Sequence, residues 1–511
     1  MTGVTTIFER YADIAGSAQA FRGASTARLP LTAWANPPLW PAARGILPEL
    51  DDILEQPAQE SPAFRVTDGL HPAFVAARLL GALHIQEEAA MLPVLMLDPG
   101  GGQRILDACS APGNKTAAIA ARLGPAGRVI AVDISESRMG VLRTTLNTLG
   151  IVNVAGVQAD AAELPDRLGM FDAAMVDVPC SCEGTSRKHA DVVQCISDDA
   201  RRALSELQAR ILRSVIRHVR PGGRIVYATC TYAPEENEGV VADVIEHPEP
   251  DQGVRVLPCS AAGFTVRPGL QSWRGRTFPD ELRHAKRLWP HLSDTGGFFA
   301  VLLEKTGRGC VPSGQAVSGP SADLRPVRVD EYPWSAYRID PDAVDRLVTV
   351  RTGSKYSSVV SASLAADDVT GLSGVAALRR APEAPAAPDP AALHIGRDPS
   401  CLARVLFAGM RGLNLKGGTA RPSTAAAIRF GAHASRGILE ISSEDVRAFM
   451  RRESVPVVRF IEPNEPVPVA IVRAGGCALG LGRLDASAPG HVQSLFPKVR
   501  AGINVGLTLR P

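Results

Sequence analysis

Two segments place a cysteine at the end of a strand-like run: Asp177–Thr185 reads DVPCSCEGT and Ala228–Glu238 reads ATCTYAPEENE. A cysteine thiolate is a strong nucleophile and a good leaving group, so it suits reversible covalent attack on an electron-poor ring. Cytosine needs such attack, because its carbon 5 becomes nucleophilic only after a group has added to carbon 6. The segments therefore predict a pyrimidine modification: one thiol attacks, Asp177 holds the base edge, and the second thiol removes the carbon 5 proton.

Two other interpretations of these cysteines stay open. A cysteine at the end of a buried strand is usually a small, inert apolar side chain. Cys180 and Cys182, with Cys109 and Cys230, are also candidate ligands of a zinc ion. Their spacing is poor for a tetrahedral structural site, and neither a C-x-x-C pair nor a nearby pair of histidines supports one. We therefore predict that the protein holds no metal.

A loop suited to a cofactor lies earlier, where Leu106–Thr116 (LDACSAPGNKT) passes from a strand-like run into a helix-like run. Pro112 and Gly113 favour a tight turn, and the missing Cβ of Gly113 allows a ligand to approach the backbone. The amide groups at the start of the helix favour a carboxylate, such as that of a methionine moiety. Because open α/β sheets bind ligands at such strand–helix loops, this one is a predicted cofactor site.

Two aspartates follow the next two strand-like runs. Asp133 comes about twenty residues after the turn, where an acidic side chain can accept hydrogen bonds from ribose hydroxyls. Asp160 is placed similarly and can receive an adenine amino group. The fingerprint G-x-G-x-x-G is absent here, which disfavours a nicotinamide enzyme. Either aspartate could instead cap a helix, and it is their joint placement, one strand apart, that favours ligand binding.

The segments that position these residues alternate between strand-like and helix-like patterns. The strand-like runs are 104–109, 128–135, 171–180, 224–230 and 296–305, and the helix-like runs are 114–124, 136–150 and 200–219. Such alternation predicts a parallel sheet with helices on both faces, an α/β fold of the Rossmann-like kind.

Changes in composition divide the chain into four parts. We predict an N-terminal accessory or RNA-binding region at 1–80 and a catalytic domain at 81–305. A Gly-, Ser- and Pro-rich linker follows at 306–325, before a C-terminal region at 326–511. The Pro- and Ala-rich segment 381–392 should be extended and flexible. Alternating apolar and polar runs after it predict a small β-rich domain.

Bulk properties narrow the class of protein. The chain has 511 residues, 45% of them hydrophobic, and a formal net charge of +2. Any nucleic-acid binding must therefore come from local basic surfaces. The sequence has no unbroken apolar run of about 18 residues, so we predict no membrane contact. Nine scattered cysteines favour a reducing compartment. We expect a cytoplasmic monomer.

The motifs DACSAPGNKT, DVPCSCEGT and ATCTYAPEENE, in this order and spacing, resemble those of the Nol1/Nop2/Sun family of RNA cytosine-5 methyltransferases. The resemblance covers about 86–305, with IQEEAAML and RLWPH…GGFF as flanking motifs. It implies a Rossmann-like core that transfers methyl from S-adenosylmethionine to carbon 5 of cytosine in RNA. The C-terminal GGCALGLGRL and SLFPKVR resemble the PUA-like RNA-binding domain of bacterial ribosomal members, which favours ribosomal over transfer RNA.

The resemblance also implies roles for single residues. Cys230 would be the nucleophile, Cys180 would help release the product from the covalent adduct, and Asp177 would lie between cofactor and target base. Asp133 would bind the ribose, and Asp160 the adenine region. The S-adenosylmethionine loop would comprise Cys109, Ser110, Ala111, Pro112, Gly113, Asn114 and Lys115.

The chain departs from the family pattern at Cys182, where a glycine is common after the PCS. A larger side chain there would either narrow the target pocket or pack away from it.

RNA contacts are predicted between 267 and 291, where basic residues alternate with Trp273, Phe278 and Trp289. Basic groups can meet phosphates while aromatic faces stack unpaired bases. Arg187 and Lys188 are placed to hold the strand near the target base. The arginines between 201 and 224 are interpreted as the solvated face of a helix.

Three alternative functions remain. A DNA cytosine-5 methyltransferase would use Cys180 as its nucleophile, but the second motif, with its own Cys230, disfavours this. A transfer RNA cytosine-5 methyltransferase would share the same motifs. A non-catalytic RNA-binding ribosome assembly factor would keep the fold, but the presence of every proposed catalytic residue disfavours it.

Overall fold

The computed structural model describes residues 6–56, 63–261, 263–308, 337–339, 347–351, 356–361, 364, 404–414, 421–462 and 469–497. The segment 381–392 and most of the linker at 306–325 lie outside these residues. At the centre is a ten-stranded sheet with the order β11-β14-β15-β9-β8-β5-β6-β7-β18, and β10 pairs with β15. Its strands are β5 (Arg104–Ala108), β6 (Arg128–Asp133), β7 (Val154–Gln158), β8 (Phe171–Asp177), β9 (Val219–Thr229), β10 (Val254–Val256), β11 (Val266–Pro268), β14 (Lys286–Leu288), β15 (Phe298–Lys305) and β18 (Arg404–Ala408).

Five neighbouring strands, β7-β6-β5-β8-β9, run parallel. All five residues of β5 are buried, as expected of a strand covered on both faces. The chain proceeds from β5 to β6 and β7 on one side and to β8 and β9 on the other, so the strand order reverses at β5. A crevice for a ligand forms at such a reversal, beside the carboxyl ends of the strands. The predicted α/β core is confirmed.

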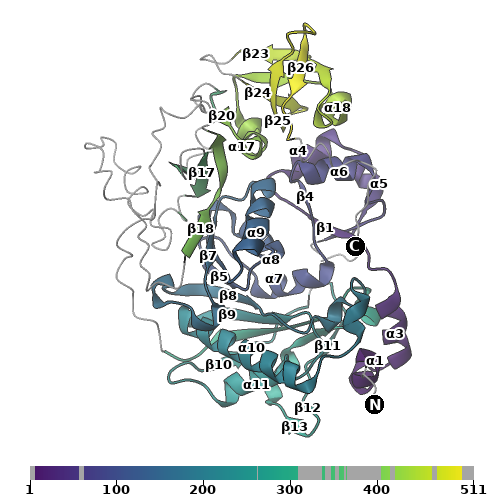
Figure 1. Ribbon diagram of the computed structural model, residues 1–511, viewed down its shortest axis with the longest axis vertical. Helices are drawn as coiled ribbons and strands as arrows, with labels where there is room; N and C mark the ends of the chain where they lie inside the picture. Colours follow the sequence, from purple (N-terminus) through teal and green to yellow (C-terminus); the bar gives the residue numbers. More distant parts are fainter. Residues whose placement is uncertain are drawn as a thin grey trace, which may run out of the picture.

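Helices cover both faces of the sheet (Figure 1). Helices α7 (Leu92–Leu97), α8 (Asn114–Leu123) and α9 (Glu136–Leu149) pack on one face, and α10 (Asp198–His218) and α11 (Glu238–Glu246) on the other. Ser135 and Ser197 cap the N-termini of α9 and α10 with their side-chain oxygens. These caps fix where each helix begins, and therefore where the strand–helix loops lie.

The C-terminal region contributes to the central sheet. Strand β18 pairs antiparallel with β7, and Phe407 packs so closely on Gly156 that a Cβ there would lie 2.3 Å from the ring. The added strand covers the hydrogen-bonding edge of β7 that a domain ending at 305 would leave open. The predicted boundaries 81–305 did not include this strand, because nothing in the sequence of β18 reveals its distant partner.

The N-terminal region contains a four-stranded sheet, β2-β3-β1-β4. Its strands are β1 (Thr32–Ala35), β2 (Leu54–Glu55), β3 (Phe64–Val66) and β4 (Leu83–Ile85), with helices α1 (Ile7–Arg10), α2 (Ala12–Ala15), α3 (Ala18–Thr26), α4 (Trp40–Ile46), α5 (Leu50–Ile53) and α6 (Pro72–Leu79) around it. Strand β4 pairs with β1, so this sheet extends past the predicted boundary at residue 80.

The C-terminal region is rich in β-structure, as predicted. It holds a six-stranded sheet, β22-β26-β25-β24-β21-β23, and a four-stranded sheet, β16-β17-β19-β20. The strands are β16 (Leu347–Arg351), β17 (Tyr356–Ser361), β19 (Met410–Asn414), β20 (Arg421–Pro422), β21 (Ile438–Glu440), β22 (Ser454–Pro456), β23 (Arg459–Ile461), β24 (Ala470–Ala474), β25 (Cys477–Leu484) and β26 (His491–Ser494), with helices α17 (Thr424–Phe430) and α18 (Val446–Met450).

The two terminal regions share one apolar core. Ile46 and Leu50 of the N-terminal region pack in the same cluster as Phe449 and Leu479 of the C-terminal region. Figure 1 shows α4, α5 and α6 beside α18. None of the helices in the described part of the chain is both long and apolar enough to cross a bilayer.

Candidate active site

The loop between β5 and α8 has the tight backbone predicted for it. Cys109 and Gly113 have φ angles of 61° and 107°, in the left-handed region. Ser110 N donates to Val132 O at 2.9 Å, and Ala111 N donates to Asp133 Oδ2 at 3.1 Å. A Cβ on Gly113 would lie 2.7 Å from Cγ of Leu142. Gly113 is thus required by close packing against α9 as well as by its φ angle.

The structure places Asp133 and Asp160 at the carboxyl ends of the neighbouring strands β6 and β7. Asp133 is only 3% exposed, and its Oδ1 accepts a hydrogen bond from Ser135 N at 2.9 Å. Asp160 is exposed and caps a short 3-10 helix by accepting from Ala162 N at 2.9 Å. Asp160 is therefore a helix cap, whereas Asp133 holds backbone groups of two loops, because the N-cap of α9 is Ser135. Each carboxylate oxygen can accept a second hydrogen bond, so their ligand-binding role stays a prediction.

An ion pair connects the cofactor loop to the first cysteine motif. Lys115, in the first turn of α8, places Nζ 2.7 Å from Oδ2 of Asp177 at the end of β8. Burial alone would lower the pKa of Lys115, but the Asp177 carboxylate overcomes this effect and raises it. The lysine therefore stays charged. The pair puts one cation and one carboxylate where the loop meets the cysteine-bearing strands.

Asp107, a residue that the sequence analysis did not single out, lies under this loop. Its Oδ2 accepts from Thr116 Oγ1 at 2.6 Å, whereas its Oδ1 is buried and has no hydrogen-bond partner among the described residues. Burial raises the pKa of Asp107 to about 7, although the Thr116 hydrogen bond acts in the opposite direction. A carboxyl group near the end of a buried strand was the feature of the sequence that could have identified Asp107.

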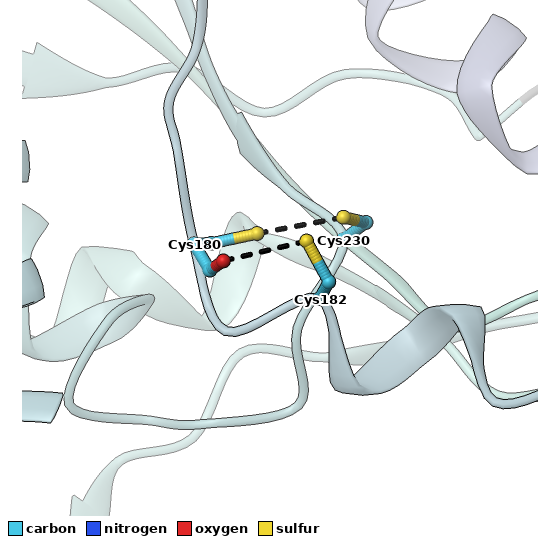
Figure 2. A group of neighbouring side chains, drawn as sticks. All are labelled: Cys180, Cys182 and Cys230. Atoms are coloured by element: carbon cyan, nitrogen blue, oxygen red, sulfur yellow. Dashed lines mark hydrogen bonds between the residues drawn. The ribbon is translucent and has the colours of Figure 1, made fainter. Parts of the chain in front are cut away.

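The structure brings the two cysteine motifs together. Figure 2 shows Cys180, after β8, facing Cys230, after β9, with their Sγ atoms 3.4 Å apart. Cys182 turns back toward them, and its Sγ lies 3.3 Å from the carbonyl oxygen of Cys180. All three sulfur atoms lie within 4.8 Å of one another. Cys109, which the zinc interpretation grouped with them, is not a member of this cluster.

The three thiols influence one another's ionisation. Hydrogen bonds with Cys182 and Cys230, and then burial, raise the pKa of Cys180. The hydrogen bond with Cys180 lowers the pKa of Cys230, but Cys182 and burial outweigh it, so the net direction is upward. The pKa of Cys182 is lowered, because the two neighbouring thiols donate to its sulfur. The cluster therefore favours one shared negative charge and disfavours a second.

A buried ionic network underlies the two cysteine loops. Arg201, 1% exposed, directs Nη1 to Glu183 Oε1 at 3.1 Å and to Glu236 Oε1 at 3.4 Å. Glu236 Oε2 accepts from the backbone N of Ser181 at 3.0 Å, and Glu183 Oε2 accepts from Thr231 Oγ1 at 2.9 Å. Ser181 and Thr231 directly follow the two cysteines, so the network fixes the position of each thiol.

Asn237 and Glu238, at the end of the second motif, hold the turn around Cys230. Asn237 accepts from Thr229 Oγ1 at 2.5 Å and donates to the carbonyl of Thr231 at 3.0 Å. Glu238 pairs with the buried Arg287, whose Nη1 donates to the carbonyl of Tyr232 at 3.0 Å. The polar tail of this motif is therefore structural.

The interpretation of 201–224 as a solvated face was wrong for Arg201. Buried residues of α10 recur at Gln208, Leu212 and Val215, and Arg201 lies on that same face. This helical spacing could have shown from the sequence that Arg201 faces the protein interior.

The predicted RNA-contact segment is also partly wrong. Trp289 is fully buried, and Phe278 and Arg287 are 5% and 2% exposed, so they cannot stack on bases or bind phosphates. Arg187 is occupied by the carbonyl groups of Ala27 and Thr295. Trp289 packs in a cluster with Ile7 and Phe8 of the N-terminal region, and Arg187 binds the carbonyl group that directly follows α3. The exposed basic residues of the segment are Arg274, Arg276 and Arg283, for which phosphate binding stays a prediction.

Comparison with known proteins shows what the central part of the chain is similar to. Residues 94–304 match the family described as 16S rRNA methyltransferase RsmB/F. The chain is 36% identical over 241 residues to ribosomal RNA small subunit methyltransferase F of Erwinia tasmaniensis, covering 47% of this chain and 48% of that one. For the Escherichia coli O139:H28 protein of the same name, identity is 34% over 274 residues, covering 52% of each chain.

Among solved structures, the chain is similar to a methyltransferase homologue protein from Pyrococcus horikoshii, with a TM-score of 0.49 and 28% identity. The alignment covers 56% of this chain and 90% of that one. The match to the relatives of known name is partial. The chain spans about half the length of the curated relatives it matches, at 48% and 52%.

Proposed function

Because residues 94–304 match the family described as 16S rRNA methyltransferase RsmB/F, we propose that this chain methylates carbon 5 of cytosine in RNA. Ribosomal RNA is the favoured substrate, because the relatives are named as ribosomal RNA small subunit methyltransferases. One observation carries the proposal: two thiols from adjacent parallel strands stand 3.4 Å apart, beside a charged Lys115–Asp177 pair.

S-adenosylmethionine supplies an electrophilic methyl group when it is bound. The donor set of this chain fits that cofactor. Asp133 and Asp160 offer carboxylate oxygens at the ends of β6 and β7, suited to ribose hydroxyls and an adenine amino group. The first turn of α8 offers backbone amides for a carboxylate, and its N-cap, Gly113, has no side chain to compete for them.

The residues of the chain divide the reaction between them. The Cys230 thiolate adds to carbon 6 of the cytosine, and Asp177 Oδ1 holds the base edge while Lys115 fixes Oδ2. Carbon 5 is then enamine-like and takes up the methyl group. Cys180 removes the carbon 5 proton, after which the bond between Cys230 sulfur and carbon 6 breaks and 5-methylcytosine leaves. The target base must be unstacked to reach these groups.

The terminal regions are proposed to bind the RNA around the target base. The six-stranded β22–β26 sheet would act as a PUA-like domain, and the N-terminal region as an accessory surface. Support comes from the apolar core that joins the two regions, because it holds them as one continuous surface.

Two cysteine variants test the proposal. We expect Cys230→Ala to lose both methyl transfer from labelled S-adenosylmethionine and covalent capture by RNA containing 5-fluorocytosine. Cys180→Ala should instead accumulate a protein–RNA adduct, because proton removal and release stall. Cys259→Ala is the matched control, a free and half-buried thiol outside the cluster.

Capture by DNA alone would contradict the RNA assignment, and normal turnover of Cys180→Ala would contradict the two-thiol mechanism. Wild-type protein that binds ribosomal RNA without incorporating methyl groups would point to the non-catalytic alternative.

A further inference from the structure

Cys182 has no part in the reaction proposed above, yet it lies against both thiols that do. Its φ angle of 59° is in the region that favours glycine, and this backbone conformation turns its side chain back toward Cys180 and Cys230. A cysteine held in this conformation gives the site a third sulfur atom.

The spacing of the three sulfur atoms matches that around a thiophilic metal ion. Zinc–sulfur bonds are about 2.3 Å long, which puts the sulfur atoms of a tetrahedral or trigonal site ~3.8–4.0 Å apart. Here one pair lies at 3.4 Å and all three pairs lie within 4.8 Å. Rotations of the three side chains that move the sulfur atoms by up to roughly an ångström would produce three equal metal–sulfur bonds.

The surroundings of the cluster also suit an ion. Cys182 is exposed and the other two cysteines are partly exposed, so an ion can enter without unfolding of the loops. Three thiolates and a divalent cation carry a net charge of minus one. The charges of Lys115 near Cys230, and of Arg138 near Cys182, act to balance it. With three ligands from one side, the fourth position stays open, unlike in a closed structural site.

We propose that Cys180, Cys182 and Cys230 form a three-thiolate site for a thiophilic divalent cation of the Zn²⁺ class. Three metal–sulfur bonds form, each thiol that still carries a proton gives it to solvent, and no atom is oxidised or reduced. The bound ion occupies the lone pairs that Cys230 and Cys180 need for attack and proton removal. It therefore inhibits the enzyme reversibly; this consequence, unlike the binding itself, rests on the proposed function.

Cadmium is the spectroscopic probe, because thiolate-to-metal charge transfer reports Cd–S bonds in the ultraviolet. The full chain, made metal-free and kept reduced with a phosphine, is titrated with Cd²⁺ and then with Zn²⁺ in competition with a chelator. We expect one high-affinity equivalent for the wild type. Cys182→Ser should weaken binding by at least ~100-fold through loss of a ligand, while Cys259→Ser should bind as the wild type does. Circular dichroism confirms that both variants are folded.

Methyl transfer is measured in parallel, with each protein compared to its own metal-free rate. Zn²⁺ should inhibit the wild type at concentrations that leave Cys182→Ser unaffected, and a chelator should reverse the inhibition. Equal Cd²⁺ affinity in the wild type and Cys182→Ser, or no stoichiometric binding by the wild type, would overturn the site. Stoichiometric binding by a wild type that transfers no methyl group would leave the site standing and refute the proposed function instead.

Discussion

Replacement of Arg201 by methionine should destabilise the protein strongly, although Arg201 contacts no proposed substrate. The side chain is 2% exposed and lies between Glu183 and Glu236, whose side chains are 1% and 0% exposed. Methionine keeps most of the buried apolar volume but removes the cation. Two buried carboxylates are then left without the charge that stabilises them.

The expected loss follows from that burial. Removing one partner of a buried ion pair typically costs about 3–5 kcal/mol, a large part of a total stability of roughly 5–15 kcal/mol. At about 2–4 °C per kcal/mol for a domain of this size, the melting temperature should fall by roughly 6–20 °C. Burial already raises the pKa of Glu236. Because protonation relieves a buried carboxylate, the deficit should be smaller at pH 5 than at pH 8.

Thermal and urea unfolding of the full chain measure the effect, with Arg202→Met as the matched control. Arg202 is the next residue of α10, and its side chain is 70% exposed beside an exposed Asp199. Its replacement makes the same change in helix propensity and should cost less than ~0.5 kcal/mol. Alkylation of the active-site thiols should also be faster in Arg201→Met, because Ser181 and Thr231 lose their anchors.

A stability of Arg201→Met within ~0.5 kcal/mol of Arg202→Met would refute the reasoning. It would mean that water, or protonation of one of the two glutamates, compensates for the lost guanidinium at little cost, and that the cysteine loops do not depend on this network.

Two further predictions concern the cofactor loop. Gly113→Ala combines a φ of 107° with a contact of 2.7 Å to Leu142, so it should displace the loop and weaken S-adenosylmethionine binding in calorimetry. Gly124→Ala is the control, because Gly124 has a φ of 59° but faces open space. Equal losses of cofactor affinity in the two variants would show that the contact between Gly113 and Leu142 is not the cause. Asp107→Asn should remove a pH dependence: the folded pKa of Asp107, about 7, lies above the unfolded value, so the wild type loses stability as pH rises toward and through 7. The wild type should lose at most ~4 kcal/mol of stability, at 1.36 kcal/mol per pKa unit. If the melting temperatures of the two proteins change in parallel between pH 5 and 8, this prediction is contradicted.

Structural features that depend on local sequence pattern were predicted well. Apolar runs with turn residues between them predicted β5, β6, β8, β9 and β15 close to where they lie, because a strand buried on both faces needs a nearly continuous apolar run. The tight turn at Gly113 followed from the same local reasoning. The two aspartates were correctly placed at strand ends, where each accepts a hydrogen bond from a nearby backbone amide.

Interpretation of charged and aromatic residues was less successful. Arg201, Arg287 and Trp289 were assigned to solvent or to RNA because their types are common on such surfaces, whereas all three are buried. A buried charge is stable only beside its partner, and here the partners are distant in sequence: Glu183 and Glu236 for Arg201, and Glu238 for Arg287. The edge strand β18 was missed because its partner, β7, is also distant in sequence.

By itself, the sequence predicted the α/β core, the tight loop after β5 and the residue types of a two-cysteine site, because these depend on periodicity and on chemistry within short segments. Only the tertiary structure decided that Cys182 joins Cys180 and Cys230 in one cluster, and that Arg201 and its two glutamates support them. Parallel strands adjacent in the sheet carry their terminal residues to one edge, and that adjacency is set by packing of the whole chain.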